Sequence, residues 1–161
     1  MKVLVAYMSY TGNTKKVAEA IYGAISEPKE IKRVEDVTSL EGYDLAFLGF
    51  PMRALGPDRK VKTFLKTHVK DRSIALFITH MAPEDSSSLQ GWIQKFRDAA
   101  VGANIVGVFD CQGQASGLIR IIMIIPLAFM RTHDTSQGQP DAARLERARA
   151  FANEIMNKLK P

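Results

Sequence analysis

The chain contains a single cysteine, Cys111, among its 161 residues. One cysteine excludes an internal disulfide framework and is typical of proteins from a reducing compartment. Because Cys111 ends an apolar run, we expect an inert, buried thiol rather than a reactive one. The first residues lead directly into a strand-like apolar run and show no signal peptide, so we expect a cytoplasmic protein.

The sequence also lacks an apolar run long enough to span a bilayer. Its longest apolar stretch, 118–130, is interrupted by Arg120 and Pro126. Three interpretations stay open for 118–130: packing into the core, an interface with a redox partner or a second subunit in a homodimer, or contact with a membrane surface. We favour the interface, because the run is longer than one edge of a small domain needs.

Motifs of the common catalytic and nucleotide-binding classes are absent. The sequence contains no G-x-x-x-x-G-K-[ST], no G-x-G-x-x-G after a strand, and no G-x-S-x-G. His133 and Asp134 are adjacent but have no Cys or His companions, so we expect no metal site. We therefore predict no catalytic residue in the chain itself, and any chemistry must come from a cofactor.

Positive charge is concentrated in one segment. Residues 53–72 carry seven Lys and Arg side chains against two Asp, and the net charge of the whole chain is +5. Nucleic-acid binding is one interpretation, but Val61, Phe64, Leu65 and His68 form an apolar stripe at helical spacing. We favour a helix with a solvated basic face and no nucleic-acid partner; an acidic protein or an anionic membrane surface could use this face.

The composition, 46% hydrophobic and 24% charged, is that of one globular domain, which we place at 1–161. Short apolar runs that alternate with helical patterns predict an α/β fold with a parallel sheet covered on both faces. The five expected strands lie at 2–8, 30–37, 45–50, 73–79 and 104–111. We expect Asp58 and one of the serines at 86–88 to cap the helices that follow them, and a last helix to begin near Asp141.

Segment 9–14 reads Ser-Tyr-Thr-Gly-Asn-Thr and lies where the first strand gives way to the first helix. The first backbone N–H groups of a helix have no internal partner, and the helix dipole adds positive potential there, so this position favours an anion. Hydroxyl and amide side chains add donors, and Gly12 lets the backbone approach a ligand closely. No Lys or Arg lies within 9–14, so we predict a phosphate site built from neutral donors.

This hexapeptide resembles the phosphate loop of the flavodoxins, a T/S-x-T-G-x-T turn that wraps the phosphate of FMN. The resemblance implies FMN as cofactor and a doubly wound, flavodoxin-like five-stranded parallel sheet in the order 2-1-3-4-5. In such sheets the ligand lies beyond the carboxyl ends of the strands, where the loops that begin at Ser9, Pro51, Thr79 and Cys111 would converge. The alternative is a helix cap that binds no ligand.

The resemblance implies two groups of cofactor-binding residues. For the phosphate these are Ser9, Thr11, Gly12, Asn13 and Thr14. For the flavin ring they are Pro51, Met52, Arg53, Ala54, Thr79, His80 and Met81, with Cys111, Gln112 and Gly113 nearby. The stacking Trp and Tyr usual in flavodoxins are missing from the two ring loops, and Met52 and Met81 offer polarizable substitutes. Positive charge on Arg53 and His80 predicts a less reducing flavin than in an acidic flavodoxin.

We predict an FMN-binding electron carrier that passes electrons between a reductase and an acceptor enzyme, with 118–130 as a candidate docking segment. The character and position of 118–130 also resemble the flavodoxin-like protoporphyrinogen oxidases, which implies an FMN-dependent oxidoreductase acting on a quinone or tetrapyrrole as the alternative. A flavin-free docking module that kept the fold is a third hypothesis.

Overall fold

The computed structural model describes residues 1–115 and 135–160, so the predictions made for 118–130 and for His133 lie outside the described residues. Five parallel strands form one sheet in the order β2-β1-β3-β4-β5, which confirms the predicted topology. The strands are β1 (Val3–Tyr7), β2 (Lys29–Arg33), β3 (Leu45–Pro51), β4 (Ser73–His80) and β5 (Asn104–Gln112). The helices are α1 (Asn13–Ala24), α2 (Arg59–His68), α3 (Leu89–Ala99) and α5 (Ala142–Lys158), with a short 3-10 turn η1 (Val34–Asp36).

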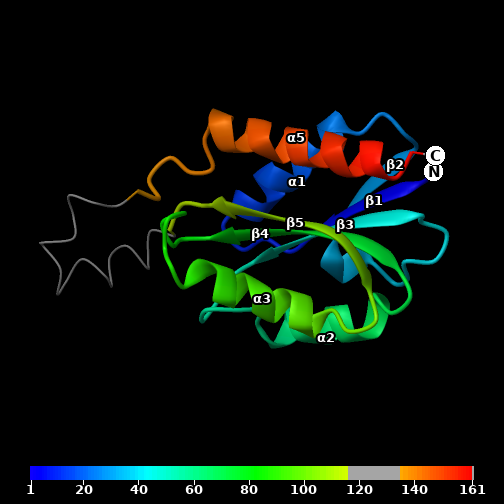
Figure 1. The fold of residues 1–161 in the computed structure, drawn as a ribbon, viewed down its shortest axis with the longest axis horizontal. Coiled ribbons are helices and arrows are strands. Elements are labelled where there is room, and N and C mark those ends of the chain that lie inside the picture. Colours follow the sequence, from blue (N-terminus) through cyan, green and yellow to red (C-terminus); the bar gives the residue numbers. More distant parts are fainter. Residues whose placement is uncertain (116–134, 161) are drawn as a thin grey trace, which may run out of the picture.

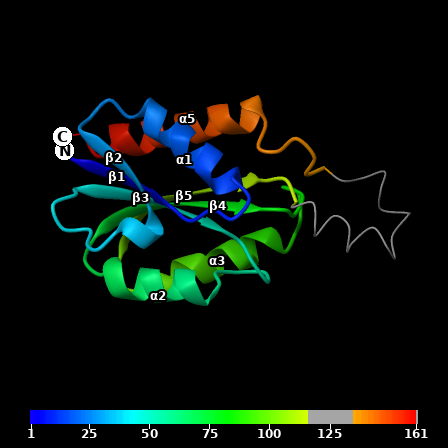
Figure 2. The same ribbon diagram turned by 180° about the vertical axis from the view of Figure 1, so that it is seen from behind.

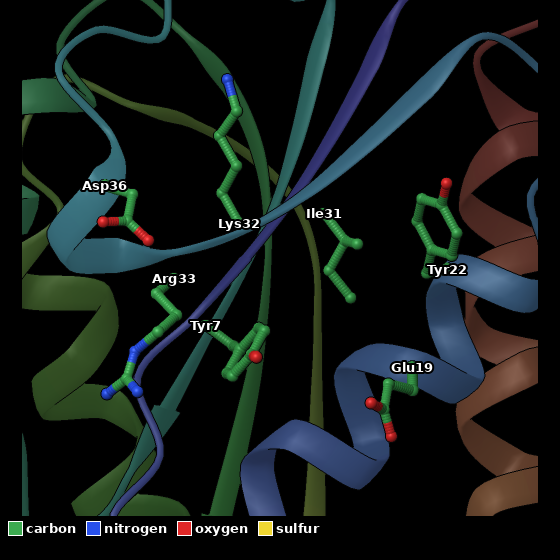
Figure 3. Close-up of a pocket in the computed structure, with 7 residues that line it drawn as sticks. All are labelled: Tyr7, Glu19, Tyr22, Ile31, Lys32, Arg33 and Asp36. Carbon is green, nitrogen blue, oxygen red and sulfur yellow. The ribbon is translucent and has the colours of Figure 1, made fainter.

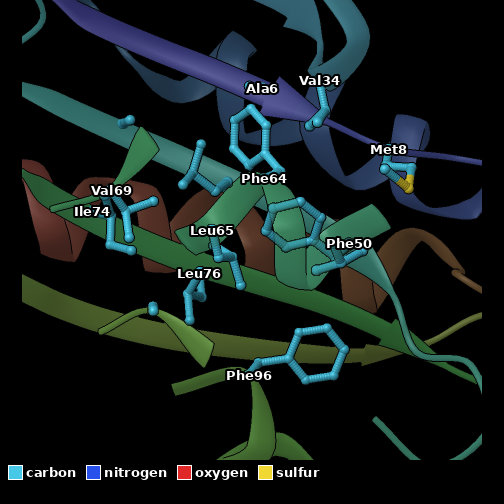
Figure 4. Close-up of a cluster of buried hydrophobic side chains, with 14 of the residues drawn as sticks. Ala6, Met8, Val34, Phe50, Phe64, Leu65, Val69, Ile74, Leu76 and Phe96 are labelled. Carbon is cyan, nitrogen blue, oxygen red and sulfur yellow. The ribbon is translucent and has the colours of Figure 1, made fainter. Parts of the chain in front are cut away.

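Helices cover both faces of the sheet, as Figures 1 and 2 show from opposite sides. Helices α1 and α5 pack on one face, while α2 and α3 pack on the other. On the α2/α3 face, Phe50, Phe64 and Phe96 fill the space between sheet and helices (Figure 4). Each such side chain contributes about 1.5–3 kcal/mol by burial, and the central strands β3 and β4 are buried almost throughout.

Helix α2 shows how the sequence pattern places its charges. Val61, Phe64 and Leu65 are buried against the sheet. The ring of His68 stacks on Phe64 with centroids 4.5 Å apart, and its Nδ1 lies 3.0 Å from the Phe64 carbonyl oxygen. The prediction that His68 is a packing residue is therefore confirmed. The basic side chains of α2 are left on the solvent side of the helix.

Several predicted strand boundaries differ from the structure by one residue, and the end of the second strand differs by four. The second strand ends at Arg33 instead of continuing to Val37, because Val34 and Val37 both turn inward and their spacing of three suits a helical turn better than an alternating strand. Strands β3 and β4 each extend by one residue, to Pro51 and His80. Pro51 is accepted at a strand end, because a proline there costs no interior ladder hydrogen bond.

Of the two predicted caps, Asp58 for α2 and a serine of 86–88 for α3, the structure confirms the one at Asp58; Asp141 also caps α5. Asp58 Oδ1 accepts a hydrogen bond from the Val61 N–H at 3.0 Å, and Asp141 Oδ1 accepts one from the Arg144 N–H at 2.9 Å. Ser88 occupies the cap position of α3, but its side chain makes no capping hydrogen bond. None of the helices described, in 1–115 and 135–160, is long and apolar enough to cross a membrane.

Candidate functional site

The loop after β1 has the geometry of an anion site. Gly12 adopts φ +90° and ψ −12°, which L-residues with side chains rarely adopt, and its N–H donates to Ser9 Oγ at 3.1 Å. Helix α1 starts at the next residue, Asn13. Within the described residues, the N–H groups of Asn13, Thr14 and Lys15 have no protein acceptor. These three donors, at the positive end of the helix dipole, suit a phosphate group.

A buried pair of hydroxyls ties this loop to the neighbouring strand β4. The Thr14 and Thr79 hydroxyl oxygens lie 2.8 Å apart and share a hydrogen bond. Both side chains are buried. Thr14 therefore fixes the start of α1 against the carboxyl end of β4, a contact between residues that are 65 positions apart in the chain.

The loop after β5 also reaches the start of α1. Asn13 Nδ2 donates to the Gln114 carbonyl oxygen at 2.8 Å, and the Gly113 N–H donates to the His80 carbonyl oxygen at 2.7 Å. A Cβ atom on Gly113 would lie 2.7 Å from Asn13 Nδ2 and 2.9 Å from Asn13 Cβ. Only glycine allows this close approach between the two segments.

The loop after β3 forms a tight turn. Arg53 and Gly56 exchange two backbone hydrogen bonds of 3.0 and 3.2 Å, while Ala54 and Leu55 have φ +47° and +62°. Two consecutive residues with positive φ are typical of a type I′ turn, which usually contains Asn or Gly. The Met52 N–H donates to the Thr79 carbonyl oxygen at 2.7 Å, so this turn is anchored to β4.

Tyr10 connects the loops after β1 and β3, and the sequence reasoning did not assign it a role. The Arg53 guanidinium carbon lies 4.8 Å from the centroid of the Tyr10 ring, in a cation–π contact. The Tyr10 hydroxyl donates to Asp58 Oδ2 at 3.1 Å. Partial burial and the hydrogen bond to Asp58 together raise the pKa of Tyr10. A large aromatic within an otherwise small and polar loop was the signal that could have singled it out.

The structure corrects the prediction for His80. This residue ends β4 rather than opening a loop, and its ring is buried. Its Nδ1 lies 2.9 Å from the Ala82 carbonyl oxygen, and its Nε2 lies 3.2 Å from Asp110 Oδ2. Any positive charge on this ring is thus paired with Asp110 beneath the loop, and Arg53 remains as the exposed cation among the predicted ring residues.

Gln112 and a cluster of charges hold the loop after β4 in place. Gln112 is buried, and its Nε2 donates to the Met81 carbonyl oxygen at 3.2 Å and to Thr135 Oγ1 at 2.8 Å. Glu84 accepts from Arg144 Nε at 2.8 Å and from Arg147. Burial opposes ionisation of Glu84, but the two guanidinium groups outweigh it and lower the pKa of this carboxyl. The loop is thereby joined to α5.

Cys111 is fully buried on the α1/α5 face of the sheet. Burial raises the pKa of its thiol to about 12, so almost no thiolate forms at neutral pH. The predicted burial of the thiol is confirmed, and its inertness stays a prediction. Among residues 1–115 and 135–160, no group of three or more His, Cys, Asp or Glu side chains could hold a metal ion.

A separate cavity of about 500 Å³ lies between α1 and the edge strand β2 (Figure 3). The side chains that line it include both charges, with Glu19 on the helix and Arg33 on the strand. Figure 3 shows that the Lys32 side chain points away from Ile31 and Tyr7. None of the predicted cofactor residues lines this cavity.

The structure thus brings together the predicted loops that follow β1, β3, β4 and β5. Hydrogen bonds link each of them to at least one other: Thr14 with Thr79, Asn13 with Gln114, and Met52 with Thr79. The candidate residues meet at one edge of the sheet, around donors suited to a phosphate. Their contacts with a cofactor stay a prediction.

Comparisons with known proteins agree with this arrangement. A family model described as "Flavodoxin domain" matches residues 4–153. The flavodoxin-like domain-containing protein BilS of Clostridioides difficile (strain CD3) is 35% identical to the chain over 173 residues, covering 98% of both proteins.

Solved structures share the fold. A flavodoxin from the domain Archaea matches with a TM-score of 0.64 and 18% identity, and the match covers 100% of this chain and 100% of that chain. A flavoprotein in complex with FMN from Lactobacillus acidophilus NCFM has a TM-score of 0.55 at 24% identity, over 68% of this chain and 92% of that one. The family match also supports FMN, the cofactor implied by the hexapeptide. The family model that matches residues 4–153 and the relative that is 35% identical show that the chain belongs to the flavodoxin family.

Proposed function

We propose that this protein is an FMN-dependent electron carrier that works in the cytoplasm between a reductase and an acceptor enzyme. The observation that carries the proposal is the convergence of four loops on the start of α1, where free N–H groups and Gly12 form a neutral phosphate cradle. FMN, when bound, supplies one-electron and two-electron redox chemistry.

The residues present fit the phosphate of FMN. Ser9 and Thr11 add hydroxyl groups beside the N–H donors of α1, and the absence of a side chain at Gly113 lets Asn13 keep its place at the start of that helix. Arg53 lies in the loop that would flank the ring, with its guanidinium held over Tyr10. A cation at that place stabilises the reduced, anionic cofactor. Since His80 is buried beside Asp110, the expected shift of the flavin potential to less reducing values depends on Arg53 alone.

Two features favour a carrier over an enzyme with its own substrate. In the described part of the chain, His80 and Cys111 are buried and their polar atoms contact other protein groups, so neither is available as a general base or nucleophile at the converging loops. The second feature is the family match, because a flavodoxin domain makes up residues 4–153, most of the chain. The oxidoreductase that acts on a quinone or tetrapyrrole is the second hypothesis.

Absorbance spectroscopy of the purified protein, with and without added FMN, tests cofactor binding. The variant Gly113→Ala places a methyl group against Asn13 and should raise the Kd for FMN at least about tenfold, or ~1.4 kcal/mol. Gly23→Ala is the matched control, because a Cβ there meets nothing within 4 Å and the position is helical. Protein that stays colourless with FMN would refute the proposal in favour of a flavin-free module, and equal Kd values for the two variants would remove Gly113 from the site.

A second experiment separates the carrier from the enzyme. The FMN-loaded protein is mixed with NAD(P)H and either a soluble quinone or a tetrapyrrole, with and without a flavodoxin reductase. A carrier turns over only when the reductase is present and then reduces several unrelated acceptors. Turnover of a quinone or tetrapyrrole without any reductase would instead support the oxidoreductase.

A further inference from the structure

Helix α2 presents an uncompensated row of positive charge. Arg59, Lys62 and Lys66 follow one another at spacings of three and four, which places them on one side of the helix, and Lys60 is exposed beside them. Helix α2 contains no acidic residue. Among the described residues, none of these four cations has an ion-pair partner, although exposed Lys and Arg elsewhere in the structure do, such as Lys15 with Glu19.

This arrangement works against the stability of the helix. Like charges three and four residues apart repel one another. Arg59, Lys60 and Lys62 also lie in the first turn of α2, where the helix dipole disfavours cations. The Asp58 cap offsets this only in part, because one carboxylate faces three cations in the first turn, and a sequence that breaks a local rule in this way is expected at a functional surface.

The basic row continues to the edge of the sheet that carries the proposed flavin site. Helix α2 begins at Arg59, with two residues between it and the 53–56 turn, and the Lys95 Nζ of α3 donates to the Leu55 carbonyl oxygen in that turn at 3.1 Å. The positive φ angles at this turn present Leu55 to solvent with 52% of its surface exposed. Tyr10 and Met81, on the two neighbouring loops, are 50% and 44% exposed.

An apolar centre with a charged rim is the usual anatomy of a protein interface. We propose that this surface docks an acidic protein, and that this protein is the redox partner of the carrier; the inference rests on the proposed function. The basic docking surface consists of an apolar centre and a basic rim: Tyr10, Leu55 and Met81 in the centre, and Arg53, Arg59, Lys60, Lys62, Lys66 and Lys95 around it. A protein fits better than a membrane, because the exposed positions of α2 are all polar and offer nothing to insert between lipids. Electron transfer also requires the partner to approach the flavin edge, where the surface begins.

Binding of an acidic polypeptide tests the docking surface without requiring the cofactor. The probe is fluorescein-labelled poly-L-glutamate, followed by anisotropy at about 0.15 M salt. The test variant is Arg59→Glu/Lys60→Glu, which should fold at least as well as the parent because it places carboxylates in the first turn of α2. The control is Lys158→Glu/Lys160→Glu, at the last residue of α5 and just beyond that helix (Figure 1), which makes the same change in net charge. Because both lysines form exposed ion pairs, with Glu154 and Glu27, urea unfolding is used to show that the control still folds.

We expect the Kd for poly-L-glutamate to rise at least about tenfold in the test variant and less than about twofold in the control. Equal weakening in both variants would overturn the proposal, since general attraction to a basic protein would then explain binding. Tighter binding of phosphatidylserine vesicles or of duplex DNA than of poly-L-glutamate at the same salt concentration would also overturn it, in favour of those partners.

A kinetic measurement connects the surface to electron transfer. The reduced, FMN-loaded protein is oxidised by hexacyanoferrate(III), an anion, or by tris(phenanthroline)cobalt(III), a cation, at increasing salt. The anionic oxidant should react about tenfold more slowly in the test variant at low salt, while the cationic oxidant reacts faster. Unchanged rates would show that the surface is not at the electron exit. Failure to retain FMN, seen in the absorbance spectrum, would refute the proposed function while leaving the binding result intact.

Discussion

The hydrogen bond between Thr14 and Thr79 allows a quantitative test of how the phosphate loop is held. The two hydroxyl oxygens are 2.8 Å apart, and the residues are only 1% and 4% exposed, so water cannot replace either partner. Thr14→Val keeps the shape and the β-branching of the side chain but leaves the Thr79 hydroxyl buried without its partner. We expect this change to lower the free energy of unfolding by about 1–3 kcal/mol.

The double variant Thr14→Val/Thr79→Val removes both polar groups from the same space. Because no hydroxyl is then left unsatisfied, its free energy of unfolding should lie closer to that of the parent than either single variant does. The coupling energy from the complete mutant cycle should therefore exceed the loss measured in either single variant. Thr63→Val, on the exposed face of α2, is the matched control and should stay within about 0.5 kcal/mol of the parent.

Urea unfolding of the FMN-free protein, followed by circular dichroism, measures all four free energies. With an m-value of about 2 kcal/mol/M, a loss of ~2 kcal/mol lowers the midpoint by about 1 M. Additive single-variant effects, with a coupling energy near zero, would refute the reasoning, because they would show that the two hydroxyls do not depend on each other. The Kd for FMN should rise in both single variants, since the pair fixes the start of α1 against β4.

Three further perturbations test separate parts of the structure. Ala54→Gly should raise the free energy of unfolding by about 0.5–1 kcal/mol, because Ala54 has φ +47°, whereas the same substitution at exposed Ala150, in the interior of α5, should lower it by about 1 kcal/mol. Thermal unfolding compares the two variants, and changes of equal sign would contradict the strain at the turn. The Cys111 thiol should react with Ellman's reagent about 10³-fold more slowly in the native protein than after unfolding, because only the thiolate reacts and the thiol pKa is raised from 9.0 to about 12. A fast reaction of the native protein would show that the thiol is accessible. Because the pKa of Glu84 is lowered in the folded state, its ionised carboxylate stabilises the protein fully above the ordinary pKa of 4.5, and this stabilisation is lost as the pH falls through the lowered value. The free energy of unfolding in urea should therefore be about 0.5–1 kcal/mol lower for Glu84→Gln than for the parent at pH 7, and the difference should be smaller at pH 3. A difference that grows on acidification would contradict the ion pairs with Arg144 and Arg147.

Much of the architecture could be predicted because its causes are local in the chain. Apolar runs give the five strands, helical spacing gives the buried stripe of α2, and Asp58 and Asp141 cap helices three residues before the N–H groups that they bind. The phosphate loop is equally local, since its glycine and its hydroxyl groups follow β1 directly. The error at the end of β2 also has a local cause, because Val34 and Val37 fit either a strand edge or a turn until the core selects one.

What the sequence by itself determined is thus the order of the elements, the parallel sheet and the loop that begins α1. Only the tertiary structure decided which side chains meet: Asn13 with Gln114, 101 residues away, and His80 with Asp110, 30 residues away. The cation–π contact between Arg53 and Tyr10, on two different loops, was likewise decided by the tertiary structure. The physical reason is that these partners depend on the register of neighbouring strands and on the path of each loop, both of which are fixed only when the whole sheet has formed.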